Sequence, residues 1–151
     1  MKRFIATIML LLPFSAMASI PELSQFINQH ANKEGLMVSS IDGNMIKMMA
    51  EQGDIDYSKI ELIELMMIQN NELTEDIMQR VYKILAALDT ESLIRHSDDG
   101  SIIDVRYTIG DNDNITHIIV LINSDNDNSG IIVISCDISP DELNDYVQLQ
   151  I

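Results

Sequence analysis

The spacing of apolar residues along this chain changes near residue 90. Before that point they recur mostly every three or four positions, the period of a helix packed on one side. Residues 73–88 show this best, and shorter stretches at 23–31 and 45–49 show it as well. Between these helices, residues 36–41 and 60–68 have the composition of strands.

After residue 90 apolar residues alternate with polar ones, as they do in β-strands. Four strands with short polar connections are predicted at 92–97, 102–109, 115–123 and 131–138. Short connections join antiparallel neighbours, so these strands form a meander. The third is apolar on both faces and is predicted to be central. A last helix begins near Ser139 and Pro140.

The strand at 102–109 has two different faces. Ile103, Val105 and Tyr107 point one way, toward the predicted core. Asp104 and Arg106 point the other way, toward water. The predicted fold class is α+β, a mainly antiparallel sheet with a C-terminal four-strand meander and helices packed on one face.

The first 18 residues have the features of a secretory signal peptide. A basic start is followed by a short apolar run, a proline, and the small residues Ala16 and Ala18 of a cleavage site. Cleavage would leave a single α+β domain over 19–151, and no later stretch is apolar enough to insert into a membrane. The expected location is periplasmic or secreted.

The charge of the chain narrows its possible partners. Loss of residues 1–18 removes two basic and no acidic residues, so the formal net charge goes from −15 to −17. Such a surface repels nucleic acid and anionic lipid, which excludes nucleic acid as an expected partner. It attracts cations or a basic protein surface, or it serves only to keep an exported protein soluble.

The stretch DNDNSG, residues 125–130, resembles the first half of a calcium-binding loop. Such a loop takes oxygen ligands at positions one, three and five, glycine at six and a glutamate at twelve. Position twelve here is Cys136, and strands flank the segment. These residue types also favour tight hairpin turns, so a plain turn is preferred and a calcium site is the alternative.

Topology supports the calcium alternative. Alternate turns of a meander lie at the same end of the sheet, so the turns at 98–100 and 124–130 are predicted to be neighbours, about 10 Å apart. The candidate metal ligands are therefore Asp98, Asp99, Asp125, Asp127 and Ser129. No other cofactor is expected.

Catalytic motifs are absent from the sequence, and the chain is predicted not to be an enzyme. His30, His96 and His117 are isolated from one another, and no nucleophile elbow or metalloprotease motif occurs. Cys136, the sole cysteine, follows an apolar strand and is expected to be an inert buried thiol. Glu61 and Glu64 are expected on opposite faces of one strand, where they cannot act together.

Seven segments in a fixed order give the chain a family resemblance: NKEG (32–35), VSSI (38–41), MIKMM (45–49), IELI (60–63), SDDG (97–100), IVIS (132–135) and DISPDEL (137–143). The chain resembles the domain-of-unknown-function family numbered 4252, small exported proteins of Bacteroidetes. The resemblance implies an exported single-domain protein and favours a non-enzymatic role. It implies no catalytic residues.

Two functions are expected from these observations. The first is an exported binding or regulatory module that contacts a protein partner in the cell envelope. It would use a face of the sheet or the Met-rich helix at 45–49, although core filling is the simpler interpretation of those methionines. The alternative is a calcium-dependent structural or sensing protein that uses the acidic hairpin turns.

Overall fold

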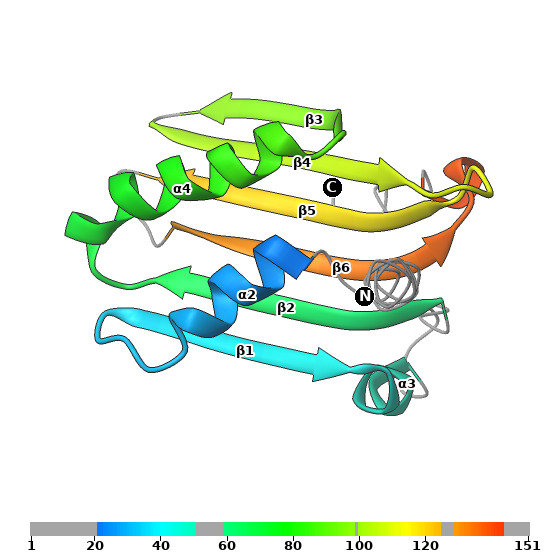
Figure 1. Ribbon diagram of the computed structural model, residues 1–151, viewed down its shortest axis with the longest axis horizontal. Coiled ribbons are helices and arrows are strands. Elements are labelled where there is room, and N and C mark those ends of the chain that lie inside the picture. The colour runs from blue at the N-terminus through cyan, green and yellow to red at the C-terminus, as the bar shows by residue number, and fades with distance from the viewer. Residues whose placement is uncertain (1–20, 51–58, 99, 125–128, 144–151) are drawn as a thin grey trace, which may run out of the picture.

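The computed structural model describes residues 21–50, 59–98, 100–124 and 129–143. Six strands form one antiparallel sheet in the order β1-β2-β6-β5-β4-β3 (Figure 1). The strands are β1 Leu36–Asp42, β2 Ile60–Ile68, β3 Glu91–Asp98, β4 Ser101–Ile109, β5 Ile115–Ser124 and β6 Ser129–Ile138. The helices are α2 Pro21–Gln29, α3 Gly43–Ala50 and α4 Thr74–Ala87, with a 3₁₀ turn, η1, at Asn71–Leu73. The predicted signal peptide lies outside the described residues.

The predicted meander is present. Strands β3, β4, β5 and β6 follow one another as antiparallel neighbours, and β6 then pairs with β2. Strands β5 and β6 are therefore central, as the apolar character of both faces of β5 predicts. The α+β class and the mainly antiparallel sheet are confirmed.

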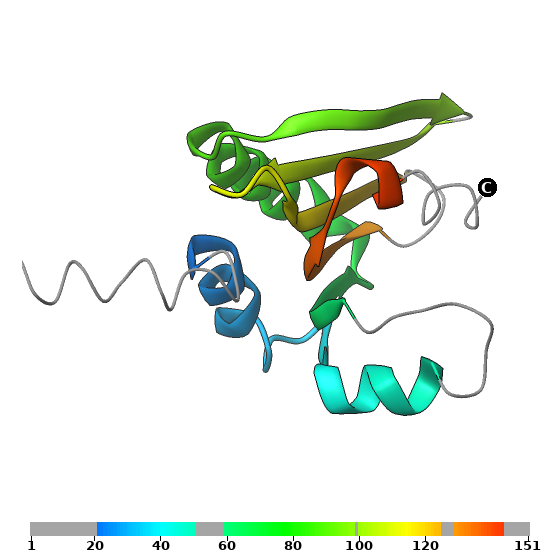
Figure 2. The ribbon, with the colours of Figure 1, turned by 90° about the vertical axis from the view of Figure 1, so that its right-hand side faces the viewer.

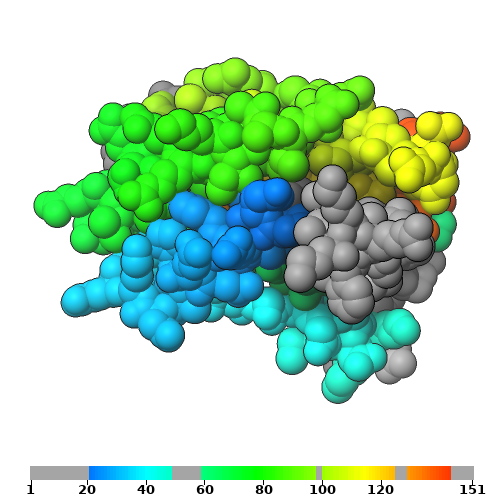
Figure 3. Space-filling model, in the orientation of Figure 1, coloured from blue at the N-terminus to red at the C-terminus, as the bar shows by residue number. Residues whose placement is uncertain are grey.

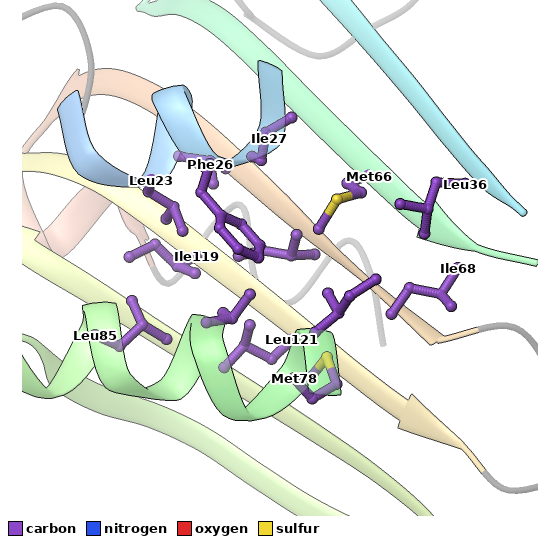
Figure 4. Close-up of a cluster of buried hydrophobic side chains, with 14 residues drawn as sticks. Leu23, Phe26, Ile27, Leu36, Met66, Ile68, Met78, Leu85, Ile119 and Leu121 are labelled. Carbon is purple, nitrogen blue, oxygen red and sulfur yellow. The ribbon is translucent and has the colours of Figure 1, made fainter. Parts of the chain in front are cut away.

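Helices α2 and α4 cover one face of the sheet, which is called here the helix face. Figure 2 shows both helices on the same side of the strands, and Figure 3 shows their atoms meeting over this face. Their buried side chains include Leu23, Ile27, Val81 and Leu85. They pack on the central strands around Ile119 and neighbouring aliphatic residues (Figure 4).

Helix α4 is preceded by the 3₁₀ turn η1, which the sequence analysis did not predict. The side chain of Asn70 accepts a hydrogen bond from Glu72 N at 3.1 Å and caps η1. Gly35 meets this turn, since its carbonyl accepts from Gln69 N at 2.8 Å. Its φ of +84° is left-handed, and a Cβ there would lie 2.8 Å from Asn70 Cβ. The loop before β1 therefore requires glycine at this position.

The predicted orientation of β4 is wrong. Asp104 is 1% exposed and lies on the helix face, in register with Leu121 of β5. Ile103 points to the opposite face and is 39% exposed. Asp104 can be buried because Arg106, next but one along the strand, pairs with it at 3.0 Å. A buried ion pair has replaced the apolar contact that the pattern suggested.

One further buried carboxylate on the helix face is held by a helix. Ser24 of α2 donates to the Glu64 carboxylate at 2.7 Å, and Glu64 is buried. Glu61 is exposed, so the two glutamates do not form a pair, as predicted. No helix among the described residues is both long and apolar enough to cross a membrane.

Candidate functional site

The face of the sheet opposite α2 and α4 is apolar, and it is called here the open face. Strand register places alternate residues of all six strands on it. Its members are Met37, Ser39 and Ile41 of β1, Ile63, Leu65 and Met67 of β2, Gly130, Ile132 and Ile134 of β6, Ile118, Val120 and Ile122 of β5, Ile103, Val105 and Tyr107 of β4, and Ile94 and His96 of β3.

Most side chains of the open face remain accessible to solvent. Its residues on β5, such as Val120, are partly exposed, whereas their neighbours Ile119 and Leu121 on the helix face are fully buried. At the margins Met37 is 45% exposed. At one end of the described face Leu143 joins a second buried cluster with Ile138, against which the partly buried Tyr107, Ile118 and Ile134 pack. Soluble proteins seldom leave a contiguous apolar surface of this size open to solvent.

The composition of the open face is unusual for so acidic a chain. Outside β3 its one acidic residue is the exposed Glu61 at the start of β2, which points away from the buried Glu64, and His96 is its one basic residue. Acidic residues stand at its margin, at Glu91 and Asp98, the two ends of the edge strand β3. The Tyr107 hydroxyl donates to Glu91 at 2.6 Å, and this bond raises the pKa of Tyr107. The interior of the face thus offers aliphatic contact without charge.

Helix α3 extends the apolar surface. Figure 2 shows it projecting from the β1 edge on the side away from α2 and α4. Asp42 caps it by accepting from Met45 N at 3.0 Å, and the buried Ile46 anchors it. Met48 is 69% exposed and Met45 is also exposed. Core filling is therefore the wrong interpretation for these two methionines, and an adaptable contact surface fits them better.

The candidate cation site is described only in part. Asp99, Asp125 and Asp127 lie outside the described residues, and so does the side chain of Asp98. Ser101 and Ser124, which flank these two segments in the sequence, are paired, and their hydroxyls are 2.9 Å apart.

Ser129, the remaining candidate ligand, has a structural role in the hairpin between β5 and β6. It is fully buried, and its Oγ accepts from Ser124 N at 2.9 Å and donates to Ser124 O at 3.3 Å. Among the described residues, no three histidine, cysteine or carboxylate side chains come together as a metal site requires.

A polar pocket lies at the other end of the sheet. It has a volume of about 500 Å³ and is lined by Lys59, Glu61, Asn114, Asp137, Ser139 and Glu142. Lys59 and Glu142 form an ion pair at 2.6 Å, and Asn114 donates to Asp137 at 2.8 Å. These contacts tie the end of β6 to the start of β2. The pocket was not predicted because Lys59 and Glu142 are 83 residues apart.

The three histidines do not form a site. His30 follows α2 and its Nδ1 lies 2.7 Å from Phe26 O, whereas His96 is on edge strand β3 and His117 on central strand β5. His117 Nδ1 contacts the hydroxyls of Thr108 and Thr116, both at 3.0 Å. Burial lowers the pKa of His117 to about 4, which keeps it neutral.

Two possible nucleophiles lie near His117, but neither is activated by it. Ser135 is opposite His117 in the register, yet Ser135 Oγ and His117 Nε2 are both buried and have no hydrogen-bond partner among the described residues. Cys136 Sγ contacts Ile115 O at 3.6 Å, and burial raises its pKa to about 12. In the described geometry Ser135 and His117 are neighbours within the sheet that share no hydrogen bond, and the Cys136 thiol is not ionised.

A family model extends over this whole arrangement. The model described as domain of unknown function DUF4252 matches residues 26–146, which include every strand of the sheet. The chain belongs to the DUF4252 family. The open face and α3 are therefore parts of the family's domain. No curated protein and no solved structure gives a significant match to the chain.

Proposed function

We propose that this DUF4252 protein is an exported binding or regulatory module that acts through protein–protein contact at the open face. The observation that carries the proposal is a six-stranded sheet whose second face is aliphatic and accessible. Removing apolar surface from water stabilises a complex by roughly 25 cal/mol per Å² before the costs of association. Helix α3, with Met45 and Met48, borders this surface and widens it.

The sequence of the central strands supports the same function. Strands β5 and β6 have aliphatic residues on both faces, such as Val120 beside Leu121 and Ile132 beside Val133. Strands with this composition are typically buried on both sides. A sheet face that remains in water usually carries polar residues instead, so contact with another polypeptide explains the composition.

Site-specific photo-crosslinking in the producing cell tests the proposal. A photoreactive amino acid is placed at Ile103, an exposed position of the open face, and, as a matched control, at Gln79, an exposed residue of α4. Adducts with another polypeptide that form from position 103 and not from 79 support it. If position 103 forms no intermolecular adduct, the open face is not a contact surface and the proposal fails.

A calcium-dependent structural or sensing role is the second candidate. The pairing of Ser101 with Ser124 supports it, because Ser101 follows Asp98 and Asp99 in the sequence and Ser124 precedes Asp125 and Asp127. Clustered carboxylates repel one another, and a bound cation would relieve that repulsion. Thermal unfolding with calcium and with chelator distinguishes this role from the first.

A further inference from the structure

We infer that the partner of the open face is a second copy of this chain, packed sheet against sheet. The inference rests on the proposed function, since it requires the open face to be a contact surface. It adds the identity of the partner and the symmetry of the complex. Three properties of the surface lead to it: size, composition and charge.

The open face has the size that a stable dimer needs. A six-stranded sheet with strands of about nine residues has a face of roughly 29 by 30 Å, on the order of 800 Å². One partner contributes about 800 Å² to a standard protein interface. The helical turn at residues 140–143 brings Leu143 over one corner of the face, and α3 adds area at the β1 edge.

The composition fits a permanent interface between identical chains. Binding hot spots of transient interfaces are enriched in tryptophan, tyrosine and arginine. The open face has Tyr107 at one side, Ser39, Gly130 and His96 at single positions, and isoleucine, valine, leucine and methionine at the others. It therefore resembles a domain core cut in half, which is typical of obligate homodimers.

The charge distribution favours the open face over the other surfaces of the chain as the site of self-association. Each chain has a formal net charge of −15, so two copies repel when their acidic surfaces approach. The interior of the open face has no acidic residue, and Glu61, Glu91 and Asp98 stand at its margin. Two copies that meet face to face bury only uncharged side chains at the centre, and the exposed Glu61 and Glu91 lie at the rim of the contact.

The geometry of sheet packing permits this dimer. Two sheets pack face to face about 10 Å apart, with their strands rotated by about 30°. The contact is isologous, so a two-fold axis passes through the central strands. Val120 of β5 lies between Val105 and Ile132 in the register, close to that axis. The product is a four-layer particle with α2 and α4 of both copies outermost.

The molar mass of the exported form of the full chain, measured by light scattering coupled to size-exclusion chromatography, tests the inference. The wild type is expected at twice the mass of one chain. Val120→Lys is expected to weaken self-association by more than about 100-fold, because each dimer would bury two lysines near its axis. Ile103→Lys provides a second variant at a position that is already 39% exposed, where the folded monomer tolerates a charge. Gln79→Lys is the control and remains dimeric.

Each other outcome overturns the inference. A wild-type monomer overturns it, and a monomer that dimerises only after removal of residues 144–151 identifies those residues as the occupant. A dimer that survives both face variants assembles through another surface. Crosslinking from the exposed position Ile103 separates the two proposals without placing a charge on the face. A self-adduct supports both, an adduct with a different protein keeps the proposed function and rejects the dimer, and no adduct rejects both.

Discussion

Arg106 donates from its Nε to Asp104 Oδ2 at 3.0 Å, between the sheet and helix α4. The two residues are two positions apart on β4, so both point toward the helix. The guanidinium carbon also lies 5.8 Å from the centre of the Tyr82 ring. Burial and then the Asp104 charge raise the pKa of Tyr82. Helix α4 therefore contacts β4 through the charged pair of Asp104 and Arg106, while Ile103 of the same strand points to the open face.

Arg106→Ala is expected to lower the free energy of unfolding by about 3 kcal/mol, because it leaves the Asp104 carboxylate buried without its cation. Denaturant titration followed by circular dichroism measures the loss. Arg80→Ala is the control, since Arg80 forms an exposed ion pair with Asp76 at 3.4 Å and should cost less than about 1 kcal/mol. Equal losses in the two variants would contradict the explanation, and adding Asp104→Asn to Arg106→Ala should restore part of the stability.

The alternation of residues in β4 predicts which side chains share a face, but not which face is covered. Ile103 and Val105 alternate with Asp104 and Arg106 as in any half-buried strand, and a pattern of this kind assigns the apolar side to the core. The assignment fails because α4 passes over Asp104, whose charge Arg106 balances within the same strand. Coverage depends on where a helix from another part of the chain packs, and local spacing does not contain that information.

The sequence predicts the elements and the meander well, because turn residues and hydrophobic period act locally. The open face could have been anticipated from β5, where Ile118 and Val120 add a second apolar face to the one formed by Ile119 and Leu121. The pocket around Lys59 could not, since it depends on the pairing of distant segments.

His117 should make the fold sensitive to mild acid. Its pKa is 6.5 in the unfolded chain and about 4 in the fold, where its buried Nε2 has no partner to stabilise a second proton. Between these values the unfolded state binds more protons, so stability is full above pH 6.5 and falls as pH drops toward 4. The loss is at most about 3 kcal/mol.

Urea unfolding at pH 7 and pH 4.5 measures this effect against His117→Gln, which lacks the titrating group. The wild type should lose about 2 kcal/mol more than the variant over this range, since carboxylate titration contributes to both. Nuclear magnetic resonance of the imidazole provides an independent value of the pKa. A folded-state pKa near 6.5, or identical pH profiles for the two proteins, would refute the prediction.

Cys136 should be inert toward thiol reagents in the native protein. It is buried, and its pKa of about 12 leaves almost no thiolate at pH 8. An aromatic disulfide reagent is expected to modify it within minutes in guanidinium and not within hours in buffer. Gln79→Cys serves as the control, because that variant should titrate one exposed thiol under native conditions. Rapid native labelling of Cys136 would show that this end of the sheet opens readily.

Calcium should raise the melting temperature if the two acidic turns form a cation site. A site with the millimolar or submillimolar affinity of extracellular modules would stabilise the fold by about 1 to 3 kcal/mol at 10 mM calcium, or roughly 5 °C. The Asp125→Asn/Asp127→Asn variant should lose that shift. Calcium also screens the repulsion of a chain with a net charge of −15, so scans in sodium chloride of equal ionic strength are needed as a reference. A shift equal in wild type and variant, or none at millimolar calcium, would leave the turns as connections whose closeness reflects only the pairing of Ser101 with Ser124.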